Sequence, residues 1–196
     1  MNKRILLIQG HPDAAHQHLC VALEQAYREG ALQQGHQVRR IHIAALDFPL
    51  LTSQEEWEHG PLPASLHTAQ DDIVWAEHLV FFFPLWLGDM PALVKGFLEQ
   101  IARPGFAFAA GEGQMAMRKK ALSGRSARII ITMGMPGFVY RWYFLAHSLK
   151  SMKRNILGFV GIGPVRDTIV GLAGKLSADQ AQRWLARMAA LGRAAA

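Results

Sequence analysis

The segment Leu79-Val80-Phe81-Phe82-Phe83 is the strongest strand signal in this chain of 196 residues. Its aromatic and β-branched side chains favour the extended conformation, and Pro84, directly after it, ends the strand. A short run that is apolar throughout is typical of a strand buried on both faces, as in a parallel sheet that helices cover on both sides.

Four further segments are predicted as strands, at residues 5–8, 38–43, 127–132 and 159–162. Helical periodicity or helix-start signals lie between and after them, most clearly at residues 19–27, 93–101 and 177–191. Strands that alternate with helices predict an α/β fold with one parallel sheet between two helical layers. We expect a single domain over residues 1–196, with a flavodoxin-like or a Rossmann-like strand order.

The composition is that of a globular protein, with 51% hydrophobic and 18% charged residues. No apolar run approaches the roughly 20 residues that span a bilayer, and no targeting segment is recognised, so the expected location is the cytoplasm. The one cysteine, Cys20, forms no internal disulfide, which fits a reducing compartment. We expect it to be a small core residue of a helix.

The net charge of +6 and the pI of about 9.8 allow a nucleic acid or an anionic small ligand as partner. The basic residues are scattered, without the mixture of aromatic and basic residues that is typical of an RNA-binding surface. We interpret the charge as a solvated surface with some attraction for phosphorylated cofactors, and we expect neither nucleic acid binding nor membrane insertion.

Three loops that follow predicted strands contain unusual residues: residues 9–18, 84–91 and 132–137. In an open parallel sheet, ligands bind beyond the carboxyl ends of the strands, at the point where the strand order reverses. The candidate site is therefore expected where these three loops meet.

The first loop contains His11, His16 and His18 and leads into a helix. A helix N-terminus suits a phosphate, and histidines add hydrogen-bond donors. The alternative is a plain turn with surface histidines. A metal site is disfavoured because the sequence offers no convincing fourth ligand.

The second loop lies between Pro84 and Pro91 and contains Trp86, which can stack on a flat heterocycle or pack under the turn. In the third loop, Gly134 and Gly137 allow the backbone to approach a ligand closely. The phenol of Tyr140, just beyond this loop, can donate a hydrogen bond to charge on a reduced ligand.

Together these pieces resemble the NAD(P)H:quinone oxidoreductase branch of the flavodoxin-like superfamily, which includes the modulator of drug activity. The matching pieces are Ile5-Leu6-Leu7-Ile8-Gln9-Gly10-His11-Pro12, Pro84-Leu85-Trp86, Pro91-Ala92-Leu93-Val94-Lys95-Gly96-Phe97, Pro104-Gly105-Phe106-Ala107-Phe108, and Thr132-Met133-Gly134 followed by Tyr140. Each piece alone is weakly specific, whereas their order and spacing together are quite specific.

The resemblance implies a five-stranded parallel sheet of order 2-1-3-4-5 and a flavin cofactor, FAD or alternatively FMN. It implies NAD(P)H as co-substrate and a quinone, or a related azo or nitro compound, as the acceptor of a two-electron hydride transfer. It also implies a homodimer whose active site is shared across the interface. A flavin-binding regulatory subunit of a membrane transporter is the alternative function.

The resemblance further implies roles for individual residues. The phosphate end of the flavin is assigned to His11, His16 and His18, although the family often has Ser or Thr and Asn at the last two positions. The isoalloxazine ring is assigned to Pro84, Leu85, Trp86 and Leu87, and its pyrimidine side to Thr132, Met133, Gly134 and Met135. Tyr140 and His147 are the catalytic candidates, and Phe106 and Phe108 are assigned to the wall of the substrate pocket.

Overall fold

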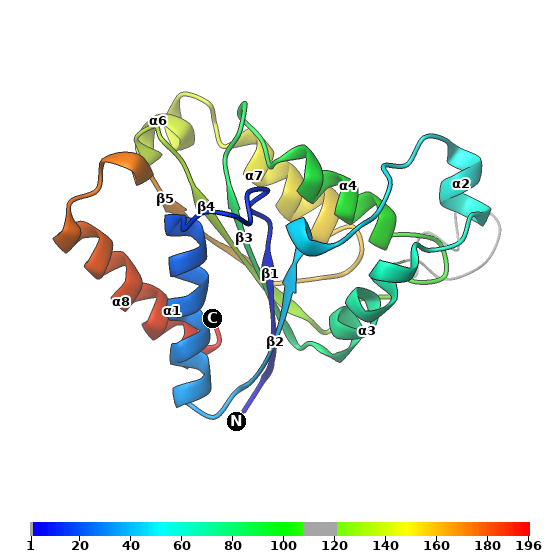
Figure 1. Ribbon diagram of the computed structural model, residues 1–196, viewed down its shortest axis with the longest axis horizontal. Coiled ribbons are helices and arrows are strands. Elements are labelled where there is room, and N and C mark those ends of the chain that lie inside the picture. Colours follow the sequence, from blue (N-terminus) through cyan, green and yellow to red (C-terminus); the bar gives the residue numbers. More distant parts are fainter. Residues whose placement is uncertain (1, 108–120) are drawn as a thin grey trace.

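The computed structural model describes residues 2–107 and 121–196, which form one five-stranded sheet (Figure 1). Its strands are β1 (Arg4–Gln9), β2 (Gln37–His42), β3 (His78–Pro84), β4 (Ser126–Thr132) and β5 (Val165–Val170). Every neighbouring pair is parallel, and the order is β2-β1-β3-β4-β5. The predicted α/β fold and the strand order are confirmed.

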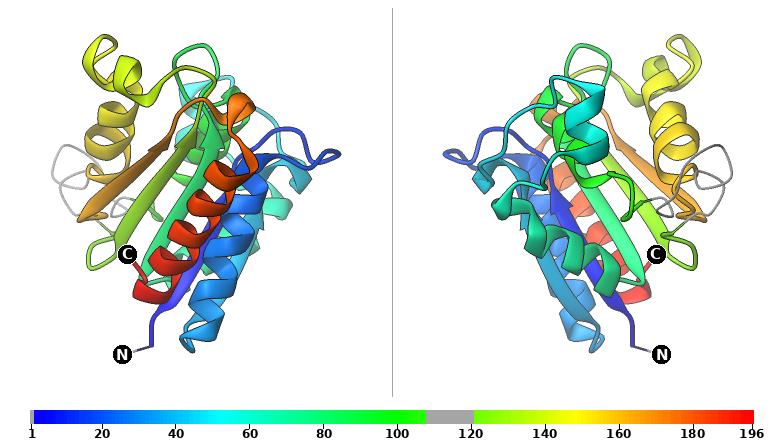
Figure 2. Two further views of the ribbon diagram at one scale, coloured as in Figure 1. Left: turned by 90° about the vertical axis from the view of Figure 1, so that its left-hand side faces the viewer. Right: turned by 90° about the vertical axis from the view of Figure 1, so that its right-hand side faces the viewer.

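Helices cover both faces of the sheet, as Figure 1 shows. One face carries α1 (Leu19–Gln33) and α8 (Ala178–Ala194), which lie side by side in Figure 2. The other carries α3 (His67–Trp75), α4 (Ala92–Ile101), α7 (His147–Ser151) and the π-helical segment η3 (Met152–Leu157). The short helices α2 (Gln54–His59) and α6 (Gly137–Trp142), and the 3₁₀ turns η1 (Ile43–Ala45), η2 (Ala64–Leu66) and η4 (Ala173–Lys175), lie in connections.

The core has two halves because successive side chains of a strand point to opposite faces of the sheet. On β3, Val80 and Phe82 pack with Leu23 and Tyr27 of α1, whereas Phe81 and Phe83 pack on the α3 and α4 side. Both kinds of position are buried, which explains why the strand is apolar throughout. Cys20 is buried in the α1 half, as expected.

Two glycines allow α1 and α8 to pack closely. A Cβ atom at Gly30 would lie 2.1 Å from the carbonyl oxygen of Ala189, and one at Gly192 would lie 2.0 Å from that of Tyr27. Any side chain at either position would therefore force the helices apart. The helix-start signal at residue 177 is a capping box that begins α8, in which the side chains of Ser177 and Gln180 each accept from the backbone N–H of the other.

The prediction of a fifth strand at residues 159–162 is wrong. These residues form the turn after η3, where Val160 and Ile162 pack into the core, and the strand β5 begins at Val165. The criterion of a continuous apolar run misses β5 because it lies at the edge of the sheet and its sequence is Val-Arg-Asp-Thr-Ile-Val.

None of the described helices is long and apolar enough to cross a membrane.

Candidate functional site

The loops that follow β1, β3 and β4 meet at the carboxyl edge of the sheet, as predicted. The N–H of Gly10 donates to the carbonyl of Phe82 at 2.7 Å, and the N–H of Leu85 donates to that of Thr132 at 2.8 Å. The N–H of Met133 donates in turn to the carbonyl of Val170 at 3.0 Å. Each loop is thus fixed by a backbone bond to a neighbouring strand, which gives the candidate site a rigid floor.

The loop after β1 is folded tightly by its own side chains. The Oε1 atom of Gln9 accepts from the N–H of His11 at 3.0 Å, and the Nδ1 atom of His11 accepts from the N–H of Asp13 at 3.2 Å. The N–H of Ala15 donates to Oδ1 of Asp13 at 2.8 Å. His11 is therefore a structural member of the loop, with its Nδ1 atom engaged.

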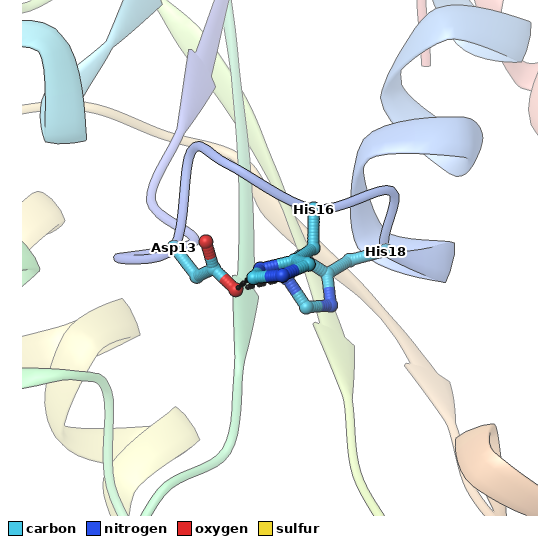
Figure 3. A group of neighbouring side chains, drawn as sticks. All are labelled: Asp13, His16 and His18. Atoms are coloured by element: carbon cyan, nitrogen blue, oxygen red, sulfur yellow. Dashed lines mark hydrogen bonds and ion pairs between the residues drawn. The ribbon is translucent and has the colours of Figure 1, made fainter.

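Asp13 brings two of the predicted histidines together, as Figure 3 shows. Its Oδ2 atom lies 2.7 Å from Nδ1 of His16 and 2.9 Å from Nε2 of His18. The bond from His18, the N–H of Ala15 and the bond from His16 lower the pKa of Asp13. The ring of His11 stacks on that of His18, with centroids 3.7 Å apart. Burial and the neighbouring His18 lower the pKa of His11.

The sequence analysis did not single out Asp13. The signal that points to it is the spacing Asp-x-x-His-x-His, which places all three side chains on one short loop. A carboxylate in this pattern can accept from both imidazoles, and the structure shows that it does.

The second loop is a tight turn that presents two apolar side chains. Trp86 and Asp89 exchange backbone hydrogen bonds of 2.9 and 3.0 Å, and Leu87 and Gly88 between them have φ values of 48° and 83°. Two successive left-handed residues define a type I′ turn. The exposure of Leu87 is 107% and that of Trp86 is 49%. The indole also lies edge-on to His11, with centroids 6.1 Å apart, so the first two loops meet here.

The third loop is divided between the interior and the surface. Thr132 and Met133 are buried, whereas Gly134 is exposed and a Cβ atom there would have no neighbour within 4 Å. Met135 is half-buried, and its carbonyl accepts from the N–H of Leu172 at 3.1 Å. Of the four residues predicted in this loop, only Gly134 and Met135 thus reach the surface at the carboxyl edge.

The hydroxyl of Tyr140 lies inside the protein. The side chain is 2% exposed, and its oxygen lies 2.7 Å from Oγ of Ser148 and accepts from the N–H of Leu149 at 3.1 Å. These bonds tie α6 to α7. His147, the other catalytic candidate, is exposed at the first position of α7. The structure therefore brings the first two loops together but does not turn the Tyr140 hydroxyl outward.

Phe106 is half-buried and lines an apolar cavity of about 40 Å³. The same cavity is lined by Ile8 of β1, by Leu79 of β3 and by Leu122, which precedes β4. The assignment of Phe106 to the wall of the substrate pocket stays a prediction. Phe108 lies outside the described residues.

An exposed apolar patch follows the third loop, which the sequence analysis did not identify as a surface. We call it the α6 patch; it consists of Phe138, Trp142, Tyr143, Phe144 and Leu145. The neighbouring Arg141 and the η3 residue Lys153 both bond the carboxylate of Asp167 on β5, at 2.9 and 2.8 Å. This ion pair network fixes α6, and with it the patch, to the edge strand.

Comparisons with known proteins agree with this architecture. A model of the flavodoxin-like fold family matches residues 3–191. The chain is 27% identical over 155 residues to a ribosyldihydronicotinamide dehydrogenase-like protein of Penicillium crustosum, covering 67% of this chain but only 57% of that protein. It is 27% identical over 170 residues to the uncharacterized NAD(P)H oxidoreductase YcaK of Escherichia coli (strain K12), covering 82% and 80%.

Among solved structures, the NAD(P)H:quinone oxidoreductase from Methanothermobacter marburgensis shares the fold with a TM-score of 0.80 and 23% identity, covering 98% of this chain and 96% of that one. Because the family model matches nearly the whole chain and the sheet has the order β2-β1-β3-β4-β5, this chain belongs to the flavodoxin-like fold family.

Proposed function

We propose that the chain is a flavin-dependent NAD(P)H oxidoreductase that reduces quinones, or related azo or nitro compounds, by two-electron transfer. The observation that carries the proposal is the meeting of the three loops at the carboxyl edge, where the strand order reverses between β1 and β3. The names of the relatives support it, with an NAD(P)H oxidoreductase among the sequence matches and an NAD(P)H:quinone oxidoreductase among the similar folds.

The proposed cofactor is FAD, with FMN as the alternative, and its phosphate end is assigned to the loop before α1. This helix has no acidic residue in its first turn, and its N-cap residue His18 forms no side-chain cap. The positive end of the helix dipole and its first N–H groups therefore suit a phosphate. His11, His16 and His18 lie beside them, and the carboxylate of Asp13 is the group in this loop that opposes an anion.

The ring of the flavin is assigned to the second and third loops. Trp86 and Leu87 present exposed apolar surface that suits a flat heterocycle, and Gly134 leaves space for close approach of a ligand. The full proposed set for the ring is Pro84, Leu85, Trp86, Leu87, Thr132, Met133, Gly134 and Met135. A flavin held by these residues would supply two-electron redox chemistry between NAD(P)H and the acceptor. The residues of the chain hold the flavin and the acceptor in place and exclude water from the site.

We further propose a homodimer in which two copies share the acceptor site. The α6 patch supports this, because an exposed apolar patch of this kind marks an interaction surface. Phe106 and Phe108 stay assigned to the wall of the acceptor pocket. His147 remains the candidate for contact with the acceptor, and Tyr140 is assigned to positioning α6 against α7.

The test uses the full chain, purified without added cofactor. We expect the absorption bands of a flavin, a released cofactor that mass analysis identifies, and NAD(P)H oxidation that a simple quinone accelerates. Trp86→Ala should weaken flavin retention about tenfold through lost ring contact, whereas Trp184→Ala on α8 should not. A colourless protein that takes up neither FMN nor FAD overturns the proposal. Bound flavin without NAD(P)H oxidation favours a regulatory subunit instead.

A further inference from the structure

Three metal-ligating side chains converge in the loop before α1. The Oδ2 atom of Asp13, the Nδ1 atom of His16 and the Nε2 atom of His18 all lie within 4.8 Å of one another. Figure 3 shows both imidazole rings pointing at the same carboxylate oxygen. The side chains of His16 and Asp13 are accessible from solvent, with exposures of 75% and 36%. An ion can therefore enter without any rearrangement of the core.

We propose that Asp13, His16 and His18 bind a divalent transition-metal ion of the Zn²⁺ type. Imidazole nitrogens with a carboxylate oxygen suit zinc and its neighbours, whereas magnesium and calcium prefer oxygen ligands alone. Three protein ligands with an open fourth position are typical of zinc sites at which water or another molecule completes the shell.

The observed geometry lies close to that of a metal site. Ligand atoms about 2.05 Å from a tetrahedral zinc ion are about 3.3 Å apart, compared with 2.7 and 2.9 Å for the two present carboxylate–imidazole contacts. These two contacts would have to open by roughly half an ångström. The two imidazole nitrogens, which lie within 4.8 Å of each other, would have to adopt a similar separation. Each ring has only to carry its proton on the other nitrogen, so neutral imidazoles can bind the ion. Oδ1 of Asp13 remains bonded to the N–H of Ala15 and holds the carboxylate in place.

The charge of the loop gives such an ion a role, in an inference that rests on the proposed function. With neutral imidazoles, Asp13, His16 and His18 together carry one negative charge, which repels the phosphate that the proposed function places in front of α1. A divalent ion changes the net charge of the three side chains and the ion from −1 to +1, and its open coordination position can accept a phosphate oxygen. The same loop would then bind the flavin more tightly when the metal is present.

The experiment is a calorimetric titration of Zn²⁺ into the full chain after chelator treatment and removal of any affinity tag. We expect one ion per chain. His16→Asn and His18→Asn should each weaken binding at least about tenfold, and Asp13→Asn should do the same, because an amide oxygen is a poorer ligand but still accepts from Ala15. The matched control is His59→Asn on α2, whose histidine is exposed to a similar degree and lies outside the cluster. Co²⁺ in place of Zn²⁺ should give the visible bands of a low-coordinate site.

The metal site is overturned if the chain does not bind zinc stoichiometrically. It is also overturned if the three variants at Asp13, His16 and His18 bind zinc as tightly as the control variant His59→Asn. A second titration, of FMN and FAD with and without Zn²⁺, measures the effect on the cofactor, and equal flavin affinity in both conditions overturns the role in phosphate binding. The outcomes separate the two proposals. Zinc binding by a chain that takes up no flavin contradicts the proposed function alone, and a yellow, active chain that ignores zinc contradicts this inference alone.

Discussion

His78 is a buried imidazole at the start of β3, far along the strand from the candidate site. Its Nδ1 atom lies 2.8 Å from Oγ of Ser126, and its Nε2 atom has no hydrogen-bond partner among the described residues. Burial, followed by the positive charges of Lys3, Arg128 and Arg166, lowers the pKa of His78 from 6.5 to about 3. The native state therefore keeps this ring neutral at a pH where the unfolded chain protonates it.

Acid should consequently destabilise the protein through His78. Well above pH 6.5 the ring is neutral in both states, and its pKa has no effect on stability. As the pH falls from 6.5 towards 3, only the unfolded chain takes up the proton, so the free energy of unfolding decreases, by about 2 kcal/mol at pH 5. Urea unfolding of the protein and of His78→Leu at pH 7.5 and pH 5 measures this contribution. If the free energy of unfolding falls equally in both proteins between pH 7.5 and pH 5, His78 does not contribute to the acid sensitivity.

The hydroxyl of Tyr140 allows a second test at the scale of one atom. Tyr140→Phe leaves the buried N–H of Leu149 without its acceptor and should lower the free energy of unfolding by about 1–3 kcal/mol. Tyr143→Phe is the control, because the side chain of Tyr143 is exposed. Chemical denaturation measures both. If the two variants prove equally stable, the hydrogen bonds of the Tyr140 hydroxyl do not contribute to the free energy of unfolding.

Some of the site was predictable from individual residues, and some was not. His11, His18 and Trp86 meet because their loops follow neighbouring strands, and sequence order together with a parallel sheet is enough to predict that. The direction of the Tyr140 side chain depends on how α6 packs against α7, which no local pattern encodes. Asp13 was missed because a single carboxylate in a loop is usually a turn residue.

At the scale of elements, the central strands were the easiest to predict from sequence, whereas of the two edge strands β2 was predicted and β5 was missed. β1, β3 and β4 have neighbours on both sides and helices on both faces, so their apolar runs are visible in the sequence. The edge strand β5 alternates between buried and partly exposed positions and carries Arg166 and Asp167. Val170 packs in the α1 half of the core, and Val165 and Ile169 pack against the other half. Arg166 and Asp167, however, interrupt the apolar run, and Asp167 forms the ion pairs with α6 and η3.

The crossing of α1 and α8 makes a prediction at the same scale. Gly192→Ala places a methyl group 2.0 Å from the carbonyl oxygen of Tyr27, so the helices must separate. We expect the free energy of unfolding to fall by about 1–3 kcal/mol, the usual effect of overpacking a core. Gly174→Ala is the matched control, since a Cβ atom there meets nothing within 4 Å. Thermal unfolding compares the two, and equal midpoints would contradict the close packing of these helices.

At the scale of the whole molecule, the alternation of strands and helices was enough to predict the layers and to reduce the sheet to two strand orders, because parallel sheets allow few topologies. The choice of the order 2-1-3-4-5 came from the family resemblance. The alternation could not predict which apolar residues stay exposed. The aromatic run at residues 138–144 is as apolar as a core segment, and only the structure shows that much of it forms the α6 patch.

The α6 patch predicts the behaviour of the chain in solution. Exchange of Trp142 and Tyr143 for Ser in one variant should shift the protein from dimer to monomer in sedimentation analysis, because it removes the two most exposed aromatic rings of the patch. Leu32→Ser on α1 also removes an exposed apolar side chain, but outside the patch, and should leave the mass unchanged. A monomeric parent protein would contradict the proposed dimer directly.

The turn at Trp86–Asp89 has a practical consequence for protein engineering. Its backbone is closed by its own pair of hydrogen bonds, and the side chain of Leu87 at its tip is fully open to solvent. A library at position 87 would therefore vary what an incoming molecule meets while the scaffold stays constant. Because the position has a left-handed backbone, Asn, Asp and Gly are its most compatible substitutes, and a search for altered ligand binding would begin with these three.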